Sequence, residues 1–269
     1  MDSSVLTHLR IFDVDEILPF EWGEPSDSQS DETLIRHPFL VASLEEGEGY
    51  LLLDRAEEFR ALVASGVPQL PIQLCADSDI ELHIPRLGVT GFTEEDLNRL
   101  AMKHPDQIQI GDSEASAHHD QQFWQTVFAF GDSAPVNVWL RHSTQAGCPY
   151  PLEFIFRSIE QKGRYQPITG RLSDSGGVTR TTSYSATIEL PSFGLTQLKR
   201  VALSDRLFPP RVVKAVPSYR VLHIDFPIAV LKSEISLSEK EAFLRELIGL
   251  REQSLKTEFY QGRIYLLNL

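Results

Sequence analysis

Charged side chains gather where an apolar run, Tyr50–Leu53, meets a short amphipathic stretch. Asp54 stands at this junction, and Arg55, Glu57 and Glu58 follow within one helical turn. A carboxylate at a helix N-terminus can cap the helix or orient a reacting hydroxyl, and the free N–H groups there attract anions. Acidic side chains in the first turn also satisfy the helix dipole themselves. The residues alone therefore favour an acidic helix cap, worth about 1 kcal/mol or less for each carboxylate.

Other candidate ligand residues form no strong motif. His118 and His119 are adjacent, so on a helix they would point about 100° apart, which disfavours a metal site with Asp120. Gly176–Gly177 lacks the Lys-Ser/Thr pair that completes a phosphate-binding loop. We therefore predict no metal site and interpret the glycine pair as a turn.

The charge balance excludes some partners. The 269 residues carry 25 basic and 38 acidic side chains, a formal net charge of −13, and the longest basic run is Lys199–Arg200. Nucleic-acid binding is not expected, because it requires a surface rich in lysine and arginine.

No apolar run approaches the roughly 20 residues of a membrane span, and no signal-like segment opens the chain. With only Cys75 and Cys148, widely spaced, no disulfide framework is expected, and we predict a soluble cytoplasmic protein.

The length allows one large domain or two modest ones. Hydrophobic periodicity predicts an α+β fold, or a mixed α/β fold with few regular crossovers. A soft boundary near residue 78 divides an N-terminal unit, 1–78, from a C-terminal mixed α/β region, 79–269. These patterns do not determine the oligomeric state.

The N-terminal unit is predicted to consist of strands around one short helix. Asp54 is the expected N-cap of that helix, and Gly66 ends it. The strands are expected at Val5–Phe12, Phe39–Ser43, Tyr50–Leu53 and Leu70–Leu74.

The C-terminal region is predicted to alternate helices and strands. Helices are expected at 93–102, 120–130, 151–159, 196–203 and from Ser238 onward, with capping boxes at Thr93/Asp96 and Ser238/Glu241. Strands are expected at Tyr184–Leu190, Val212–Val216, Arg220–Phe226 and Ile264–Leu267.

With these elements placed, both ends of the chain resemble the ParB/sulfiredoxin superfamily. Within it, the chain is similar to the free L-serine kinases, including those of siderophore (staphyloferrin B type) biosynthesis. The N-terminal runs that carry the resemblance are Leu18–Glu21, Leu34–Val41, Tyr50–Asp54, Ser65–Pro68 and Leu70–Gln73. The C-terminal runs are Phe208–Lys214, Arg220–Leu222, Phe226–Lys232 and Phe259–Leu267. Residues 78–180 align only loosely, but agreement at both ends in the same order is more specific than either motif alone.

The resemblance implies an ATP- or ADP-dependent phosphotransferase that uses Mg²⁺ and acts on serine or a similar hydroxyl compound. Glu21 corresponds to the family's base for the serine hydroxyl, and Asp54 to the aspartate that opens an Asp-Gly-x-His-Arg motif. The implied substrate- or phosphate-binding residues are Arg36, His37, Arg55, Arg211, Lys214 and Arg220. Sulfiredoxin chemistry is excluded because the junction has no cysteine. Partition-protein function is excluded because the chain has no arginine-rich nucleotide motif or basic helix-turn-helix.

The phosphate side departs from the family. Arg55, Glu57 and Glu58 stand where the family has Gly, His and Arg, and the motif Pro-Ala-Gly-Val-Thr-Arg becomes Pro209–Lys214. At about 5 Å and an effective dielectric of about 20, each pair of like charges repels by roughly 3 kcal/mol before screening. One such pair would weaken nucleotide binding about a hundredfold. We therefore expect a small-molecule-binding or regulatory protein with weakened or lost phosphotransfer. The alternative is an active kinase in which Arg55 and Arg211 compensate the acidic residues.

Overall fold

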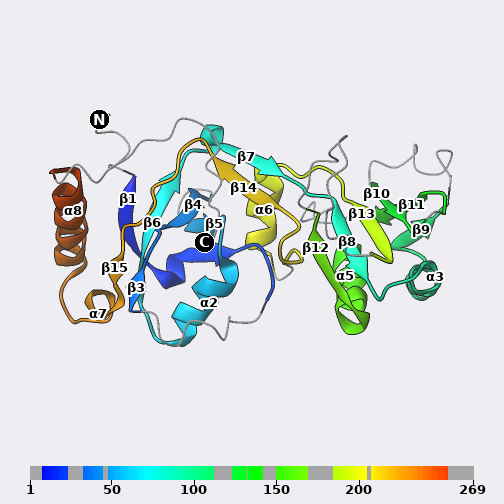
Figure 1. The fold of residues 1–269 in the computed structure, drawn as a ribbon, viewed down its shortest axis with the longest axis horizontal. Coiled ribbons are helices and arrows are strands. Elements are labelled where there is room, and N and C mark those ends of the chain that lie inside the picture. Colours follow the sequence, from blue (N-terminus) through cyan, green and yellow to red (C-terminus); the bar gives the residue numbers. More distant parts are fainter. Residues whose placement is uncertain are drawn as a thin grey trace, which may run out of the picture.

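The computed structural model describes residues 8–23, 33–44, 48–111, 123–131, 133–141, 150–168, 184–204 and 207–253. Figure 1 shows an elongated molecule with two lobes, one around a five-stranded sheet and one around a six-stranded sheet. Helices and strands are mixed along the chain, which confirms the predicted α+β fold. Within those ranges every helix is too short or too polar to span a lipid bilayer.

The first lobe contains the strand-to-helix junction. Its sheet has the order β1-β6-β4-β5-β2, in which β4 pairs parallel with β6 and antiparallel with β5. The helix α2, Ala56–Ala64, connects β5 to β6. A 3-10 turn, Val14–Glu16, separates the first two strands. The five strands are β1 (Leu9–Asp13), β2 (Ile17–Pro19), β4 (Phe39–Ser43), β5 (Tyr50–Leu52) and β6 (Gln69–Cys75).

Both faces of this sheet are buried, which explains why β4 is a continuous apolar run. Phe39 and Val41 pack on one face in a cluster that includes Phe59 of α2, whereas Leu40 and Ala42 belong to the cluster on the other face. All four residues are fully buried. The sequence predictions of β4, β5, α2 and β6 are confirmed to within two residues.

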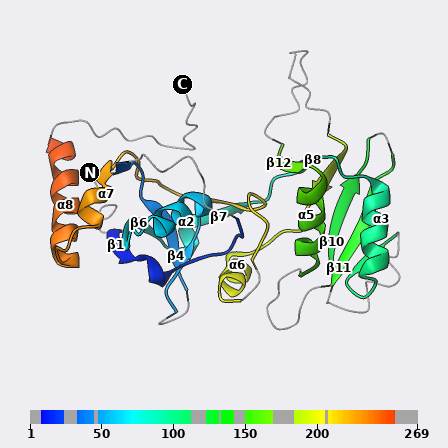
Figure 2. The same ribbon diagram turned by 90° about the horizontal axis from the view of Figure 1, so that it is seen from below.

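The second lobe is an antiparallel sheet covered by helices. Its order is β12-β8-β13-β10-β11-β9. The helices α3 (Glu94–Lys103) and α5 (Tyr150–Lys162) contact the sheet and each other (Figure 2). The strands are β8 (Leu87–Thr90), β9 (Ile108–Ile110), β10 (Phe123–Ala129), β11 (Val136–Arg141), β12 (Arg164–Pro167) and β13 (Ala186–Glu189).

After the second lobe, the chain returns to the first. Helix α6 (Leu195–Ala202) contacts β5, and β14 (Lys214–Pro217) pairs with β7 (Ile80–His83), which follows a 3-10 turn at Asp77–Asp79. Then β15 (Phe226–Pro227) pairs with β3 (Leu34–Ile35), and α8 (Leu237–Gln253) contacts β1 after the short α7 (Ile228–Leu231). Figure 1 shows this return along the first lobe. The predicted boundary at residue 78 stays a prediction.

The prediction of a helix at 120–130 is wrong, because Phe123–Ala129 forms strand β10. The apolar residues Phe123, Trp124, Val127 and Phe128 fit one side of a helix, but β10 pairs with β11 on one side and β13 on the other. In the strand, Thr126 and Phe128 alternate with more exposed residues and are fully buried. Tertiary pairing therefore overrides the local pattern.

Other predicted elements are confirmed or shifted. The Thr93/Asp96 capping box begins α3 as predicted. The box predicted at Ser238/Glu241 lies two residues earlier, where the backbone N–H of Ser236 donates to Glu239 and its hydroxyl accepts from the Glu239 N–H. The predicted strand Arg220–Phe226 is wrong except at its end, since only Phe226–Pro227 pairs with another strand.

Some predictions fall outside the described residues. These are the histidine pair His118 and His119 with Asp120, Cys148, Gly176–Gly177, and the C-terminal run Phe259–Leu267 with its expected strand. Where the structure describes the chain, it places no group of three or more His, Cys, Asp or Glu side chains to hold a metal ion.

A buried lysine joins the returning helix to the first sheet. The ammonium of Lys240 in α8 donates to the Leu231 carbonyl at 2.7 Å and to Oε1 of Gln69 at 2.9 Å. Replacing Lys240 by Met leaves both acceptors without a donor, so we expect the free energy of unfolding to fall by about 2 kcal/mol in urea denaturation. Lys232→Met is the control, because Lys232 makes one exposed bond, to the Ser65 carbonyl. Equal losses in the two variants would contradict the prediction.

Candidate active site

Asp54 links two neighbouring strands and the returning chain. Its Oδ1 accepts a hydrogen bond from the Leu40 N–H of β4 at 2.9 Å, and its Oδ2 accepts one from the Arg220 guanidinium. Only 14 % of the side chain is exposed. The prediction that Asp54 is the N-cap of α2 is wrong, because Arg55 occupies that position and its side chain makes no capping hydrogen bond. Instead of capping α2, the Asp54 carboxylate accepts hydrogen bonds from the Leu40 N–H and from Arg220.

Arg55 adopts a left-handed backbone conformation, with φ 51° and ψ 41°. For a residue other than glycine this conformation costs about 1 kcal/mol. Its guanidinium donates to Glu58 at 2.9 Å and to the His37 carbonyl at 2.7 Å, and it stacks 3.9 Å from the centre of the Phe39 ring. Its Nε lies 3.7 Å from the Asp54 carboxylate. These contacts offset the cost and hold a cation at the start of α2.

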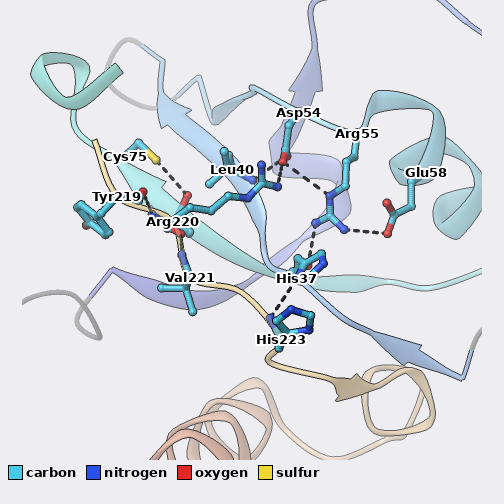
Figure 3. A network of polar contacts seen from close by, with 11 residues as sticks. His37, Leu40, Asp54, Arg55, Glu58, Cys75, Tyr219, Arg220, Val221 and His223 are labelled. Atoms are coloured by element: carbon cyan, nitrogen blue, oxygen red, sulfur yellow. Dashed lines mark hydrogen bonds and ion pairs between the residues drawn. The ribbon is translucent and has the colours of Figure 1, made fainter. Parts of the chain in front are cut away.

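His37 joins the same network from the other side (Figure 3). Its Nδ1 accepts the His223 N–H at 3.0 Å, and the two imidazole rings lie edge to face, 4.8 Å apart. Partial burial, then the nearby Arg55, lowers the pKa of His37 to about 4. The His37 side chain is therefore uncharged at pH 7, and its Nδ1 can accept the hydrogen bond from His223.

A second cluster of contacts surrounds Glu21, next to the segment that returns from the second lobe. Phe208 pairs with it through two backbone hydrogen bonds, from Phe208 to the Phe20 carbonyl at 2.7 Å and from Trp22 to the Phe208 carbonyl at 2.8 Å. The Glu21 carboxylate accepts the Arg211 N–H at 3.2 Å, and its backbone carbonyl accepts from the Arg60 guanidinium. Burial raises the pKa of Glu21 to about 7, against the lowering effects of the Arg211 N–H and Arg60.

The two acidic residues in the first turn of α2 are each paired with an arginine. Glu58 binds Arg55, as described above, and Glu57 binds the Arg211 guanidinium at 3.1 and 3.4 Å. The first turn of α2 thus reaches both clusters. From the sequence, Glu57 and Glu58 were expected to be uncompensated charges at the phosphate side. In the structure each forms an ion pair, Glu57 with Arg211 and Glu58 with Arg55.

Arg36 and Lys214 lie apart from these contacts. The side chain of Arg36 is exposed, and its carbonyl accepts the Asp225 N–H at 3.3 Å. Lys214 is exposed in β14, opposite His83. Sequence reasoning missed two residues that contact the site, Arg60 and Gln73. Gln73 could have been noticed as a polar residue inside the apolar run of β6.

Several arginine nitrogens around α2 have no hydrogen-bond partner. In the part of the chain that the structure describes, six buried side-chain N or O atoms lack one, and three are guanidinium atoms: Arg55 Nε, Arg60 Nη1 and Arg220 Nε. Leaving a buried donor unpaired costs about 1–3 kcal/mol. A water molecule or an anion would remove this cost, and arginine binds phosphate and carboxylate oxygens well.

The depressed pKa of His37 predicts a pH effect on stability. Between pH about 4 and 6.5 the unfolded chain binds a proton that folded His37 does not, so stability falls as the pH drops through this range. We expect a contribution of about 1 kcal/mol after allowance for partial exposure. His37→Asn retains a side-chain acceptor for the His223 N–H but cannot titrate, so its free energy of unfolding should depend less on pH. An unchanged slope in urea denaturation from pH 4 to 7 would contradict this.

With the geometry in place, the chain can be compared with known proteins. A scan against protein-family models and a search of curated proteins found no match. Among solved structures, SbnI with a C-terminal truncation, from Staphylococcus aureus, has a TM-score of 0.71 at 17 % identity, covering 93 % of this chain and 99 % of SbnI. A free serine kinase in complex with AMP has a TM-score of 0.60 at 14 % identity, covering 83 % of this chain and 93 % of the kinase. A mutant free serine kinase in complex with ADP has a TM-score of 0.58 at 14 % identity, with 83 % and 94 % covered.

This chain has the fold of SbnI and the free serine kinases. At these identities the likeness shows the fold alone, and it extends over most of both chains. The resemblance drawn from the two ends of the sequence is thereby confirmed at the level of the fold. The wider ParB/sulfiredoxin grouping and the roles of the site residues stay predictions.

Proposed function

We propose that this protein is a nucleotide-dependent phosphotransferase that acts on free serine or a similar small hydroxyl compound. The observation that carries this proposal is Glu21, a half-buried carboxyl group with a pKa of about 7 beside Arg211 and the first turn of α2. A general base works best when its pKa lies near the operating pH. Glu21 can therefore accept a hydroxyl proton in the neutral range, as the resemblance to the serine kinases implies.

The start of α2 gathers three arginines, the side-chain type that neutralises phosphate oxygens in phosphoryl transfer. Arg55 stands at its N-cap, Arg220 is held on Asp54, and Arg211 reaches Glu57 from the returning chain. Phosphoryl transfer is catalysed mainly by positioning and by neutralising charge on the phosphate oxygens. Arg55 Nε, 3.7 Å from Asp54, and Arg220 Nε make no hydrogen bond, which favours a phosphate group in this region.

In the proposed reaction, Glu21 takes the proton from the substrate hydroxyl as that oxygen attacks the terminal phosphorus of the nucleotide. The bond between that phosphorus and its bridging oxygen breaks, and the shortened nucleotide leaves. Mg²⁺ would enter with the nucleotide, since such sites hold it through one or two carboxylates and the phosphate oxygens. Asp54 does not fit this role, because the Leu40 N–H occupies one of its oxygens and Arg220 occupies the other.

A second candidate is ligand binding without transfer, as a regulatory protein. One observation favours it: Arg55, Arg211 and Arg220 each already bind a carboxylate of the same chain. An incoming phosphate must compete with Glu58, Glu57 and Asp54 for these cations. Such competition weakens nucleotide binding and slows turnover.

Calorimetry and a product assay separate these functions. The protein is titrated with ADP and with ATP, each with Mg²⁺, and then incubated with serine while phosphoserine is measured. Phosphoserine formation supports the transferase. Nucleotide binding without phosphoserine supports the regulatory alternative, and no binding of either nucleotide at millimolar concentration overturns the transferase.

A further inference from the structure

Arg220 belongs to a segment without regular secondary structure, so something other than a strand ladder must hold it. Residues 220–225 make no strand pairing, and His223 and Asp225 have positive φ values of 56° and 45°. Arg220 nevertheless places its guanidinium on Asp54, 166 positions earlier in the sequence. Arginine has a long side chain with many rotamers, so a defined ion pair requires a fixed backbone.

The buried side chain of Gln73 supplies this support. Its amide donates from Nε2 to the Tyr219 carbonyl at 3.0 Å and accepts at Oε1 from the Val221 N–H at 2.8 Å. Tyr219 and Val221 are the two neighbours of Arg220, which Figure 3 shows between them. Gln73 is 0 % exposed. One side chain therefore replaces the two hydrogen bonds that a neighbouring strand would make.

We infer that Gln73 is the positioning residue that fixes Arg220 against Asp54, and through it the phosphate side of the site. The claim about the phosphate rests on the proposed function, whereas the claim about the ion pair does not. Gln73 lies on the interior strand β6, beside the central strand β4, whose Leu40 N–H binds the other oxygen of Asp54. The two adjacent strands thus hold both partners of the ion pair, one directly and one through the Gln73 amide.

Gln69 provides a matched control on the same strand. Its side chain also binds two partners, donating to Asp13 at 2.8 Å and accepting from Lys240 at 2.9 Å, but it does not contact the segment around Arg220. Gln73→Leu and Gln69→Leu each remove an amide that makes two hydrogen bonds. Only Gln73→Leu removes the hydrogen bonds to Tyr219 and Val221 that hold the backbone of Arg220.

The first test measures ADP affinity by calorimetry. Gln73→Leu is expected to weaken ADP binding about tenfold, equal to the loss of one well-placed interaction. In the Arg220→Ala background it should have no further effect, whereas Gln69→Leu should keep the wild-type affinity. An equal loss from Gln73→Leu with and without Arg220 would overturn the inference. If Gln73→Leu does not fold, Gln73→Met serves instead, because its unbranched side chain is close to glutamine in volume and makes neither hydrogen bond.

The second test does not depend on nucleotide binding. Asp54→Asn is introduced into the wild type and into Gln73→Leu, and unfolding is followed in urea. If Gln73 holds Arg220 on Asp54, Asp54→Asn should change the unfolding equilibrium constant about tenfold less in the Gln73→Leu background. Equal changes in both backgrounds would overturn the inference. If the wild type binds no ADP but this coupling appears, the proposed function fails and the positioning role of Gln73 stands.

Discussion

Glu21→Gln is expected to reduce phosphoserine formation by about 10²–10⁴-fold, the usual contribution of a general base. Nucleotide affinity should stay within about twofold of the wild type, because the amide oxygen can still accept the Arg211 N–H. The measurement is kcat for phosphoserine together with ADP calorimetry on the same preparation. Glu95→Gln is the control, since Glu95 is an exposed carboxylate of α3 in the other lobe that binds Arg99. Full turnover in Glu21→Gln would show that another group takes the proton.

The raised pKa of Glu21 adds a pH signature to this prediction. Wild-type kcat should rise with pH through about 7, as Glu21 loses its proton and becomes able to act as a base. The stability effect has the opposite sign. Between pH 4.5 and about 7 the folded chain keeps a proton that the unfolded chain releases, so stability falls as the pH rises, by at most about 3 kcal/mol. Glu21→Gln should remove this part of the pH dependence of urea denaturation.

Asp54→Ala is expected to destabilise the fold by about 3–5 kcal/mol, the cost of breaking a partly buried ion pair from one side. It leaves the Leu40 N–H without its acceptor and Arg220 without its carboxylate. The free energy of unfolding in urea measures the loss. Combining it with Arg220→Met should recover part of the stability, because the unpaired cation is removed.

Glu57→Ala is the matched control for Asp54→Ala. It also breaks an ion pair with an arginine at the start of α2, but the side chains of Glu57 and Arg211 are 42 % and 62 % exposed. Exposed pairs contribute about 1 kcal/mol or less, so this variant should remain close to the wild type. Equal losses in the two variants would contradict the structural importance assigned to Asp54.

The comparison of Asp54 and Glu57 illustrates what local sequence could predict. The segment β4-β5-α2-β6 was predicted because its apolar runs, glycines and helical spacing act between near neighbours. The Thr93/Asp96 box was predicted for the same reason. β10 was not, since its apolar residues fit a helix or a strand and only pairing with β11 and β13 decides between them.

The sequence by itself, through the family resemblance, predicted which residues could do chemistry: the carboxylates Glu21 and Asp54 and the arginines at both ends of the chain. It also placed Glu57 and Glu58 in the first turn of a helix. Only the tertiary structure decided their electrostatic state. Arg211 neutralises Glu57 from 154 positions away, and burial under the returning chain moves the pKa of Glu21 to about 7. The physical reason is that ion pairing and desolvation depend on distances in space, which exist only after the C-terminal segment has folded back onto the first sheet.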